Sequence, residues 1–130
     1  MKIIWTFTLM MIPGVLSFMN VTVYSGGGLK FTCKYEEKYK TNAKYFCKGD
    51  QWLGCSDLIK TDIKDKWVNS ERFSLYDNTS ASALKVNIRN LSEEDSGTYY
   101  CAVDITTDKD SYTEVKLKVL TGEKLRSSNS

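Results

Sequence analysis

A seven-residue segment, Asp95-Ser96-Gly97-Thr98-Tyr99-Tyr100-Cys101, constrains the fold of this chain more than any other part of the sequence. Tyr99 stands two residues before Cys101, which is the spacing of a tyrosine corner. In that motif the ring packs inward and the hydroxyl bonds back to the preceding turn, which fixes a sharp entry into the next strand. Gly97 permits the tight backbone there. The segment therefore predicts a cysteine-bearing strand in a two-sheet β-sandwich.

Apolar and polar residues alternate along several other segments, which places every second side chain on one face of a strand. One such segment starts at Leu29 and puts Cys33 on its inward face. About eight strands in roughly 100 residues are typical of an all-β sandwich. The expected strands are residues 20–24, 29–35, 44–48, 57–61, 72–76, 84–89, 98–104 and 115–119.

The amino-terminal segment has the features of a secretory leader. Lys2 precedes an apolar run from Ile3 to Leu16, and Ser17 is a small residue suited to cleavage. We therefore expect a signal peptide at 1–17, one domain at 18–120 and a polar tail or the start of a stalk at 121–130. An uncleaved signal anchor is the alternative, although the run is shorter than the roughly 20 residues that cross a bilayer. We expect no transmembrane span in the rest of the chain.

The four cysteines, Cys33, Cys47, Cys55 and Cys101, are best interpreted as disulfide partners, because an exported chain reaches an oxidising compartment. Three pairings are open at this point. Structural zinc usually recruits CxxC pairs or histidines, and the sequence has neither. We expect no metal and no cofactor.

Several motifs together resemble an immunoglobulin V-set domain. They are Cys33, Phe46 before Cys47, Arg72-Phe73-Ser74-Leu75 and Asp95-x-Gly97-x-Tyr99-x-Cys101. The resemblance implies an immunoglobulin-like V-type sandwich of two antiparallel sheets with Greek-key connections. It also implies a core bridge between Cys33 and Cys101 and an ion pair between Arg72 and Asp95. The chain departs from the pattern at Phe46, where tryptophan is usual. The segment 111–115 lacks a glycine-x-glycine bulge, which weakens an interpretation as an antigen-receptor variable domain.

The segment Lys44-Tyr45-Phe46-Cys47-Lys48-Gly49, followed by Cys55, resembles the polymeric immunoglobulin receptor and the CMRF-like leukocyte mono-Ig receptors. The resemblance implies a second bridge between Cys47 and Cys55. Strand parity supports that pairing, because an inward Phe46 turns Cys47 outward, away from the interior bridge. The resemblance also implies an immune-type receptor whose partners are immunoglobulin Fc regions, membrane lipids or other cell-surface proteins.

Catalysis is hard to build from these residues. The chain contains no histidine, and no unpaired cysteine is expected, so the common triads lose their base. The 18 basic and 16 acidic residues nearly balance, which does not indicate a nucleic-acid partner. We expect a non-enzymatic extracellular recognition domain. The alternative is a soluble secreted decoy or inhibitor of such a receptor, which lacks the apolar span of about 20 residues that an anchored receptor needs.

Recognition is expected at the loops 36–43, 62–66 and 104–111, or on the sheet face that carries Tyr45 and the Cys47–Cys55 link, because loops on a rigid sandwich commonly bind partners. Three aspartates of the loop 104–111, Asp104, Asp108 and Asp110, are interpreted as solvated carboxylates. Calcium coordination is the alternative, although their spacing matches no defined calcium loop. The candidate ligand-binding residues are Tyr39, Tyr45, Trp52, Asp104, Asp108, Asp110 and Tyr112.

Three Asn-x-Ser/Thr tripeptides, at Asn20, Asn78 and Asn90, are candidate N-glycosylation sites. All three are expected near strand ends or turns, and at least one is expected to be occupied. Glycans at these positions would mark surfaces that are closed to a partner.

Overall fold

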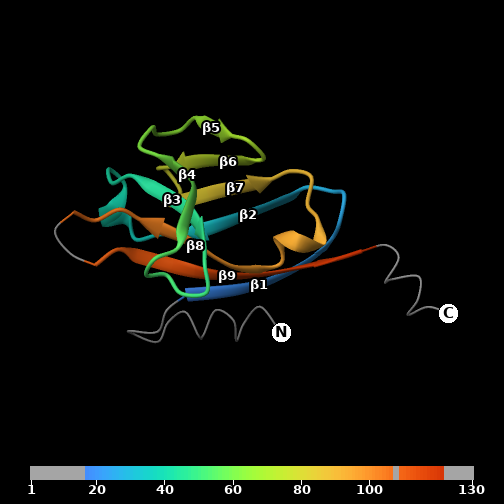
Figure 1. Ribbon diagram of the computed structural model, residues 1–130. Helices are drawn as coiled ribbons and strands as arrows, with labels where there is room; N and C mark the ends of the chain where they lie inside the picture. Colours follow the sequence, from blue (N-terminus) through green and yellow to red (C-terminus); the bar gives the residue numbers. More distant parts are fainter. Residues whose placement is uncertain (1–16, 107–108, 122–130) are drawn as a thin grey trace, which may run out of the picture.

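A computed structural model describes residues 17–106 and 109–121, which form a two-layer β-sandwich (Figure 1). The described residues contain nine strands and two short 3-10 helices, and none of their helices is long and apolar enough to cross a membrane. The strands are β1 (Ser17–Tyr24), β2 (Leu29–Lys34), β3 (Lys44–Lys48), β4 (Ser56–Thr61), β5 (Trp67–Ser70), β6 (Phe73–Asn78), β7 (Ala83–Ile88), β8 (Gly97–Val103) and β9 (Ser111–Leu120), and the 3-10 helices are η1 (Glu37–Tyr39) and η2 (Glu93–Asp95).

The strands form a five-stranded sheet in the order β1-β9-β8-β3-β4 and a four-stranded sheet in the order β2-β7-β6-β5. All pairings are antiparallel except that of β1 with β9, which run parallel. The expected all-β class and two-sheet architecture are confirmed. The segments 35–43, 62–66, 104–106 and 109–110 meet at one end of the sandwich, at the left of Figure 1, and we call this the loop end.

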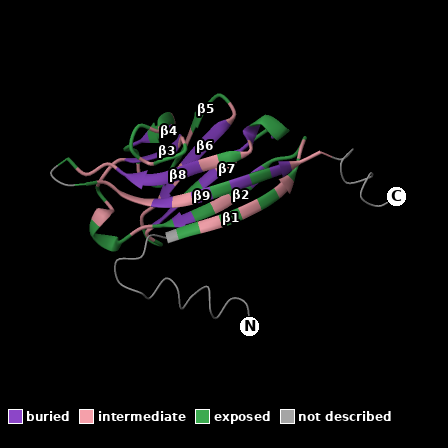
Figure 2. Ribbon diagram, turned by 60° about the horizontal axis from the view of Figure 1, so that its bottom comes forward, coloured by how far each residue is buried: buried purple, intermediate pink, exposed green. Residues whose placement is uncertain are grey.

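The core lies between the sheets and follows the alternation of the sequence. Leu84, Val86 and Ile88 on β7 are all buried, and so are the three inward apolar residues of β9. Figure 2 shows this alternation as buried and exposed bands along the strands. The alternation of apolar and polar residues therefore correctly predicts which side chains of these strands face the core, as expected for half-buried strands.

A disulfide and an aromatic cluster hold the centre of the core. Cys33 on β2 is bonded to Cys101 on β8, which joins the two sheets with a Cα–Cα distance of 6.4 Å. Phe46 is fully buried, and its ring stacks on that of Tyr99 at 5.2 Å between centroids. Phe31 and Phe73 approach the same ring at 5.8 and 6.3 Å. Phe46 therefore packs among three aromatic rings at the position where the V-set pattern usually has tryptophan.

The end of the sandwich opposite the loop end is closed around Asp95, and we call it the closed end. The Asp95 carboxylate accepts two hydrogen bonds from the Arg72 guanidinium, at 3.0 and 2.8 Å, and one from the backbone N–H of Ser92 at 2.8 Å. The Tyr99 hydroxyl donates to the backbone oxygen of Asp95 at 2.6 Å, and Gly97 has a φ of +148°. The predicted corner and the predicted ion pair with Arg72 thus meet at Asp95.

Two expectations about strands differ from the structure. Strand β5 was not expected, because an edge strand that pairs only with β6 buries few side chains and shows no alternation; of its four residues only Val68 is half-buried. Strand β1 starts earlier than expected, so Asn20 lies inside the strand, on its exposed face, and not at a strand end.

Candidate recognition site

The outer face of the five-stranded sheet carries a second hydrophobic cluster on the side away from the core. Tyr45 and Cys47 alternate with Phe46 and therefore face outward, and with Tyr100 and Ala102 they are buried all the same. Trp52, Cys55 and Tyr112 pack against them and are themselves partly exposed. An outer face of such a sheet is commonly solvated. Here it is covered.

The cover is the hairpin turn of residues 49–55, between β3 and β4, which folds back over its own sheet. A disulfide joins Cys47 to Cys55 with a Cα–Cα distance of 5.6 Å, and the backbone N–H of Cys55 donates to the oxygen of Trp52 at 3.1 Å. At Gly49 a Cβ atom would lie 2.9 Å from the Cα of Cys55. The fold-back therefore needs glycine at 49.

Hydrogen bonds join this hairpin to Asp110, just before β9. The Trp52 ring stacks on Tyr112 at 5.2 Å between centroids, and its Nε1–H donates to the Tyr45 hydroxyl at 3.0 Å. That hydroxyl in turn donates to Oδ2 of Asp110 at 2.5 Å. Burial, together with the Asp110 carboxylate, raises the pKa of Tyr45. The hydroxyl therefore stays protonated and able to donate at physiological pH.

Between the hairpin and the residues Asp104 and Asp110 lies an open groove of about 260 Å³. Its charged lining includes Lys60, which forms an ion pair with Asp104 at 2.6 Å; that hydrogen bond raises the pKa of Lys60. Leu53 stands at its rim with 77 % of its surface exposed. The groove lining is Tyr45, Trp52, Leu53, Gly54, Cys55, Asp57, Lys60, Asp104 and Asp110. Such a surface offers aromatic, aliphatic and acidic contacts to a ligand.

A buried ionic cluster, which we call the Asp77 cluster, lies at the loop end. Asp77 on β6 is fully buried and accepts hydrogen bonds from Nζ of Lys44 at 2.8 Å, from Nζ of Lys64 at 2.9 Å and from the Tyr35 hydroxyl at 2.6 Å. The Lys44 ammonium also lies 4.1 Å from the centre of the Tyr35 ring, a cation–π contact. Among the described residues every buried side-chain nitrogen and oxygen has a hydrogen-bond partner.

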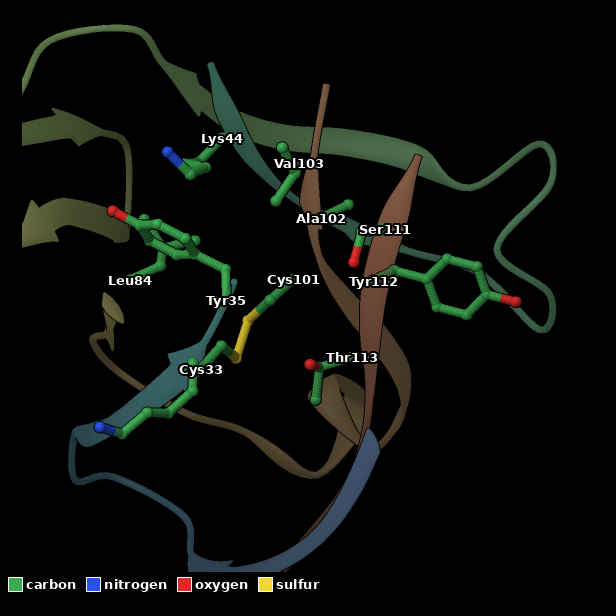
Figure 3. A pocket seen from close by; sticks show the side chains of 11 residues that line it. Cys33, Tyr35, Lys44, Leu84, Cys101, Ala102, Val103, Ser111, Tyr112 and Thr113 are labelled. Carbon is green, nitrogen blue, oxygen red and sulfur yellow. A yellow bond between two sulfur atoms is a disulfide. The ribbon is translucent and has the colours of Figure 1, made fainter. Parts of the chain in front are cut away.

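The Asp77 cluster joins segments that are far apart in the sequence. Both lysines also donate to the backbone oxygen of Asn42, at 2.8 Å from Lys44 and 2.6 Å from Lys64. The backbone N–H of Asp65 donates to the oxygen of Asp77 at 2.9 Å. Figure 3 shows Tyr35 and Lys44 beside a small cavity of about 20 Å³ near the Cys33–Cys101 bridge. The loops 35–43 and 62–66 are thus tied to one carboxylate.

The charges of this cluster shift one another's protonation. Burial on its own would raise the pKa of Asp77, but the hydrogen bonds from Lys44, Tyr35 and Lys64 outweigh it and hold that pKa below its usual value. Burial lowers the pKa of Lys44, and the Asp77 carboxylate opposes this shift. The pKa of Asp77 therefore falls because three donors share its carboxylate, whereas the pKa of Lys44 falls because its ammonium is buried.

A family model of the immunoglobulin V-set domain matches residues 18–120, which span the strands of both sheets. The chain belongs to the immunoglobulin V-set family. Its last strand, β9, pairs with β8 from Ser111 to Leu117 in one unbroken register, in keeping with the absence of the glycine-x-glycine bulge.

The relatives of this V-set domain include immune receptors. The chain is 33% identical over 107 residues to human CMRF35-like molecule 2, covering 80% of the chain and 52% of the relative. It is 36% identical over 110 residues to mouse CMRF35-like molecule 6, covering 82% and 48%. The crystal structure of the teleost fish polymeric Ig receptor ectodomain superposes with a TM-score of 0.63 and 25% identity, covering 82% of this chain and 48% of that one. The chain thus spans about half the length of these relatives, and the resemblance to both groups is confirmed.

The V-set fold brings together most of the candidate ligand-binding residues. Tyr45, Trp52, Asp110 and Tyr112 form one connected network, and Asp104 lies beside it in the groove lining. Tyr39 lies apart from them in η1 and does not line the groove, because it belongs to the loop before β3. Asp108 lies outside the described residues. Within the described part of the chain no group of three metal-binding side chains occurs.

Sequence reasoning missed the Asp77 cluster, although a signal for it was present. Lys44 stands two residues before the inward Phe46, and Asp77 two residues after the buried Leu75. Strand parity would have placed both charged side chains inward. Two opposite charges on inward positions of facing strands indicate a buried pair.

The three glycosylation candidates lie on different parts of the V-set domain. Asn78 is the last residue of β6, and its Oδ1 accepts hydrogen bonds from Ser80 and Ala81. Asn90 is exposed in the turn after β7. Asn20 is exposed on β1. Glycan attachment at each of them stays a prediction.

Proposed function

We propose that this chain is the extracellular recognition domain of an immune-type cell-surface receptor, and that it binds a protein or lipid ligand in the groove between the β3–β4 hairpin and the residues Asp104 and Asp110. The V-set family and the receptor relatives support the recognition role. The two disulfides suit an extracellular, oxidising environment. Anchoring and signalling are part of the proposal, because the chain matches only about half the length of these relatives.

The observation that carries the proposal is the order of the groove before any ligand arrives. The Cys47–Cys55 bridge, the Trp52–Tyr112 stack and the hydrogen-bonded chain from Trp52 through Tyr45 to Asp110 fix the two walls together. A surface that is already in one conformation loses less entropy on binding, so more of the contact energy appears as affinity. Aromatic residues at such a surface supply large contact area.

A pair of matched surface variants tests the proposal. Leu53→Asp places a charge at the groove rim, whereas Tyr24→Asp does so on β1, at the opposite edge of the same sheet; the two residues are 77% and 51% exposed, so both variants should fold. Fluorescent multimers of the chain are applied to a panel of leukocytes and to phospholipid vesicles. We expect Leu53→Asp to lower binding at least tenfold and Tyr24→Asp to leave it within twofold. Equal binding by both variants would place the ligand elsewhere.

A further inference from the structure

The outer face of the four-stranded sheet is cationic. This face is separate from the groove, which lies on the five-stranded sheet. Lys30 and Lys34 on β2, Lys85 on β7 and Arg89 just after β7 are all exposed. Strand parity gives this face no aspartate or glutamate within β2, β5, β6 or β7; Asp77, the only carboxylate on these strands, is buried on the inner side. We call this surface the basic face.

The charges of the basic face are not neutralised within the part of the chain that the structure describes. Among those residues none of the four cations forms an ion pair within 4.0 Å. The Arg89 guanidinium donates only to uncharged oxygens, the Ser74 hydroxyl at 2.8 Å and the backbone oxygen of Glu71 at 2.6 Å. The Lys85 ammonium lies over the Tyr76 ring at 5.3 Å. A one-sign field of this kind attracts anionic ligands.

An exposed tryptophan continues the same face. Trp67 on β5 is 46% exposed and contacts Tyr76 with 5.3 Å between the ring centroids. In the sheet register Trp67 is opposite Tyr76, Tyr76 is opposite Lys85, and Lys85 is opposite Thr32. One row across the sheet therefore presents an aromatic ring beside a cation.

The spacing of the cations suits a linear polyanion. Lys30 and Lys34 are four residues apart on one strand, which is about 13 Å, and Lys85 lies on the neighbouring strand about 4.8 Å away. Lys85 pairs with Thr32, midway between the two lysines, so the three charges are staggered and not opposed. Staggered cations over this length contact successive anionic groups of one extended chain.

We propose that the basic face binds a linear sulfated glycan, with sulfate groups at the lysines and a sugar ring against Trp67. Sugar rings have apolar faces that stack on exposed aromatic rings, and flexible lysine stems adapt to sulfates in varying positions. A membrane surface fits less well, because it favours several apolar side chains that project beyond the cations. Trp67 is the one large exposed hydrophobic residue of the described chain that lies on this face; the others, Phe18, Tyr24, Leu53 and Ile63, lie on β1 or in loops.

The test measures binding of the full chain to a heparin-derived oligosaccharide at two salt concentrations, after enzymatic removal of any N-linked glycan, because Asn78 borders Lys34 across β7. The variant Lys30→Gln/Lys34→Gln is compared with Lys116→Gln/Lys118→Gln on β9, which removes the same charge from exposed positions of the other sheet. An exposed ionic contact contributes a factor of about two. We expect the first variant to bind about fourfold more weakly and the second to bind like the unaltered chain.

Further arms separate the ligand classes. Trp67→Ala should weaken binding about threefold without changing its salt dependence, and desulfated heparin of the same length should not bind. Equal losses in the two lysine variants, or equal binding of desulfated heparin, would overturn the proposal. Binding of phosphatidylserine vesicles at physiological salt, lost in Lys30→Gln/Lys34→Gln, would assign the face to a membrane and also overturn it. Leu53→Asp leaves this face intact and should bind heparin like the unaltered chain. The groove proposal and this one can therefore fail independently.

Discussion

Each end of this V-set sandwich is closed around one carboxylate, and the two ends differ in what that carboxylate holds. At the closed end Asp95 bonds to Arg72 and to the nearby backbone of Ser92, and the side chains of Asp95 and Arg72 are 12% and 37% exposed. At the loop end Asp77 is fully buried, and Lys44 is 1% exposed. Asp95 organises the turn around η2, whereas Asp77 joins β3, β6 and the two loops that contain Tyr35 and Lys64.

The two ion pairs therefore differ in how deeply the carboxylate is buried and in how many segments it joins. Asp95 fixes a turn of the fold, whereas Asp77 orders two loops. An ion pair partly open to water contributes little, because solvent screens it and its side chains lose entropy. A buried pair gives no large net stability either, yet removing one partner is costly because the other charge is left without compensation. The loop end should therefore be far more sensitive to loss of its carboxylate.

The largest effect is expected for Asp77→Asn. The substitution leaves Lys44 buried without a counter-charge, so the free energy of unfolding should fall by about 3 kcal/mol. Denaturant unfolding measures this change. The double variant Lys44→Met/Asp77→Asn removes the buried charge and should recover most of the loss. A cost for Asp77→Asn below about 1 kcal/mol would show that the cluster is not sealed from water.

A smaller effect is expected for Asp95→Asn at the closed end. Asparagine keeps an acceptor for the backbone N–H of Ser92, and Arg72 can be hydrated, so the cost should be about 1 kcal/mol. The same unfolding experiment measures it. If this variant lost as much stability as Asp77→Asn, the proposed difference between the ends would be wrong.

The acid dependence of stability should be the smallest of the three effects. The pKa values of both Asp77 and Asp95 lie below the usual value in the folded chain, so their contributions are present above the unfolded pKa of about 3.9 and disappear as the pH falls through the folded values. Each asparagine variant should therefore show a flatter loss of stability between about pH 5 and pH 2 than the unaltered chain. Parallel curves for all three proteins would contradict the assigned pKa shifts.

The sequence allowed the closed end to be predicted and not the loop end, for a physical reason. Asp95, Gly97 and Tyr99 form a local motif whose spacing encodes one turn. Lys44 and Asp77 are separated by 33 positions. Strand parity places each side chain inward, but no spacing in the sequence pairs the two until the strands are placed face to face.

The groove stands between these two cases. Strand parity placed Tyr45 and Cys47 together on the outer face, as in the structure. The stack of Trp52 on Tyr112 depends on how far the hairpin folds back, and the sequence pattern alone does not encode that distance. Strand β5 escaped prediction because an edge strand has too few buried positions to show a period.

Amide hydrogen exchange in the two asparagine variants tests most directly whether Asp77 orders the loop end. The loops 36–43 and 62–66 contain hydrogen-bonded amides, among them those of Lys40, Asn42, Ile63 and Asp65. Under conditions in which both variants are folded, Asp77→Asn should speed exchange at these amides at least tenfold beyond any change in the core strands, and Asp95→Asn should leave them in step with the core. Equal exchange of these loops in both variants would contradict the account.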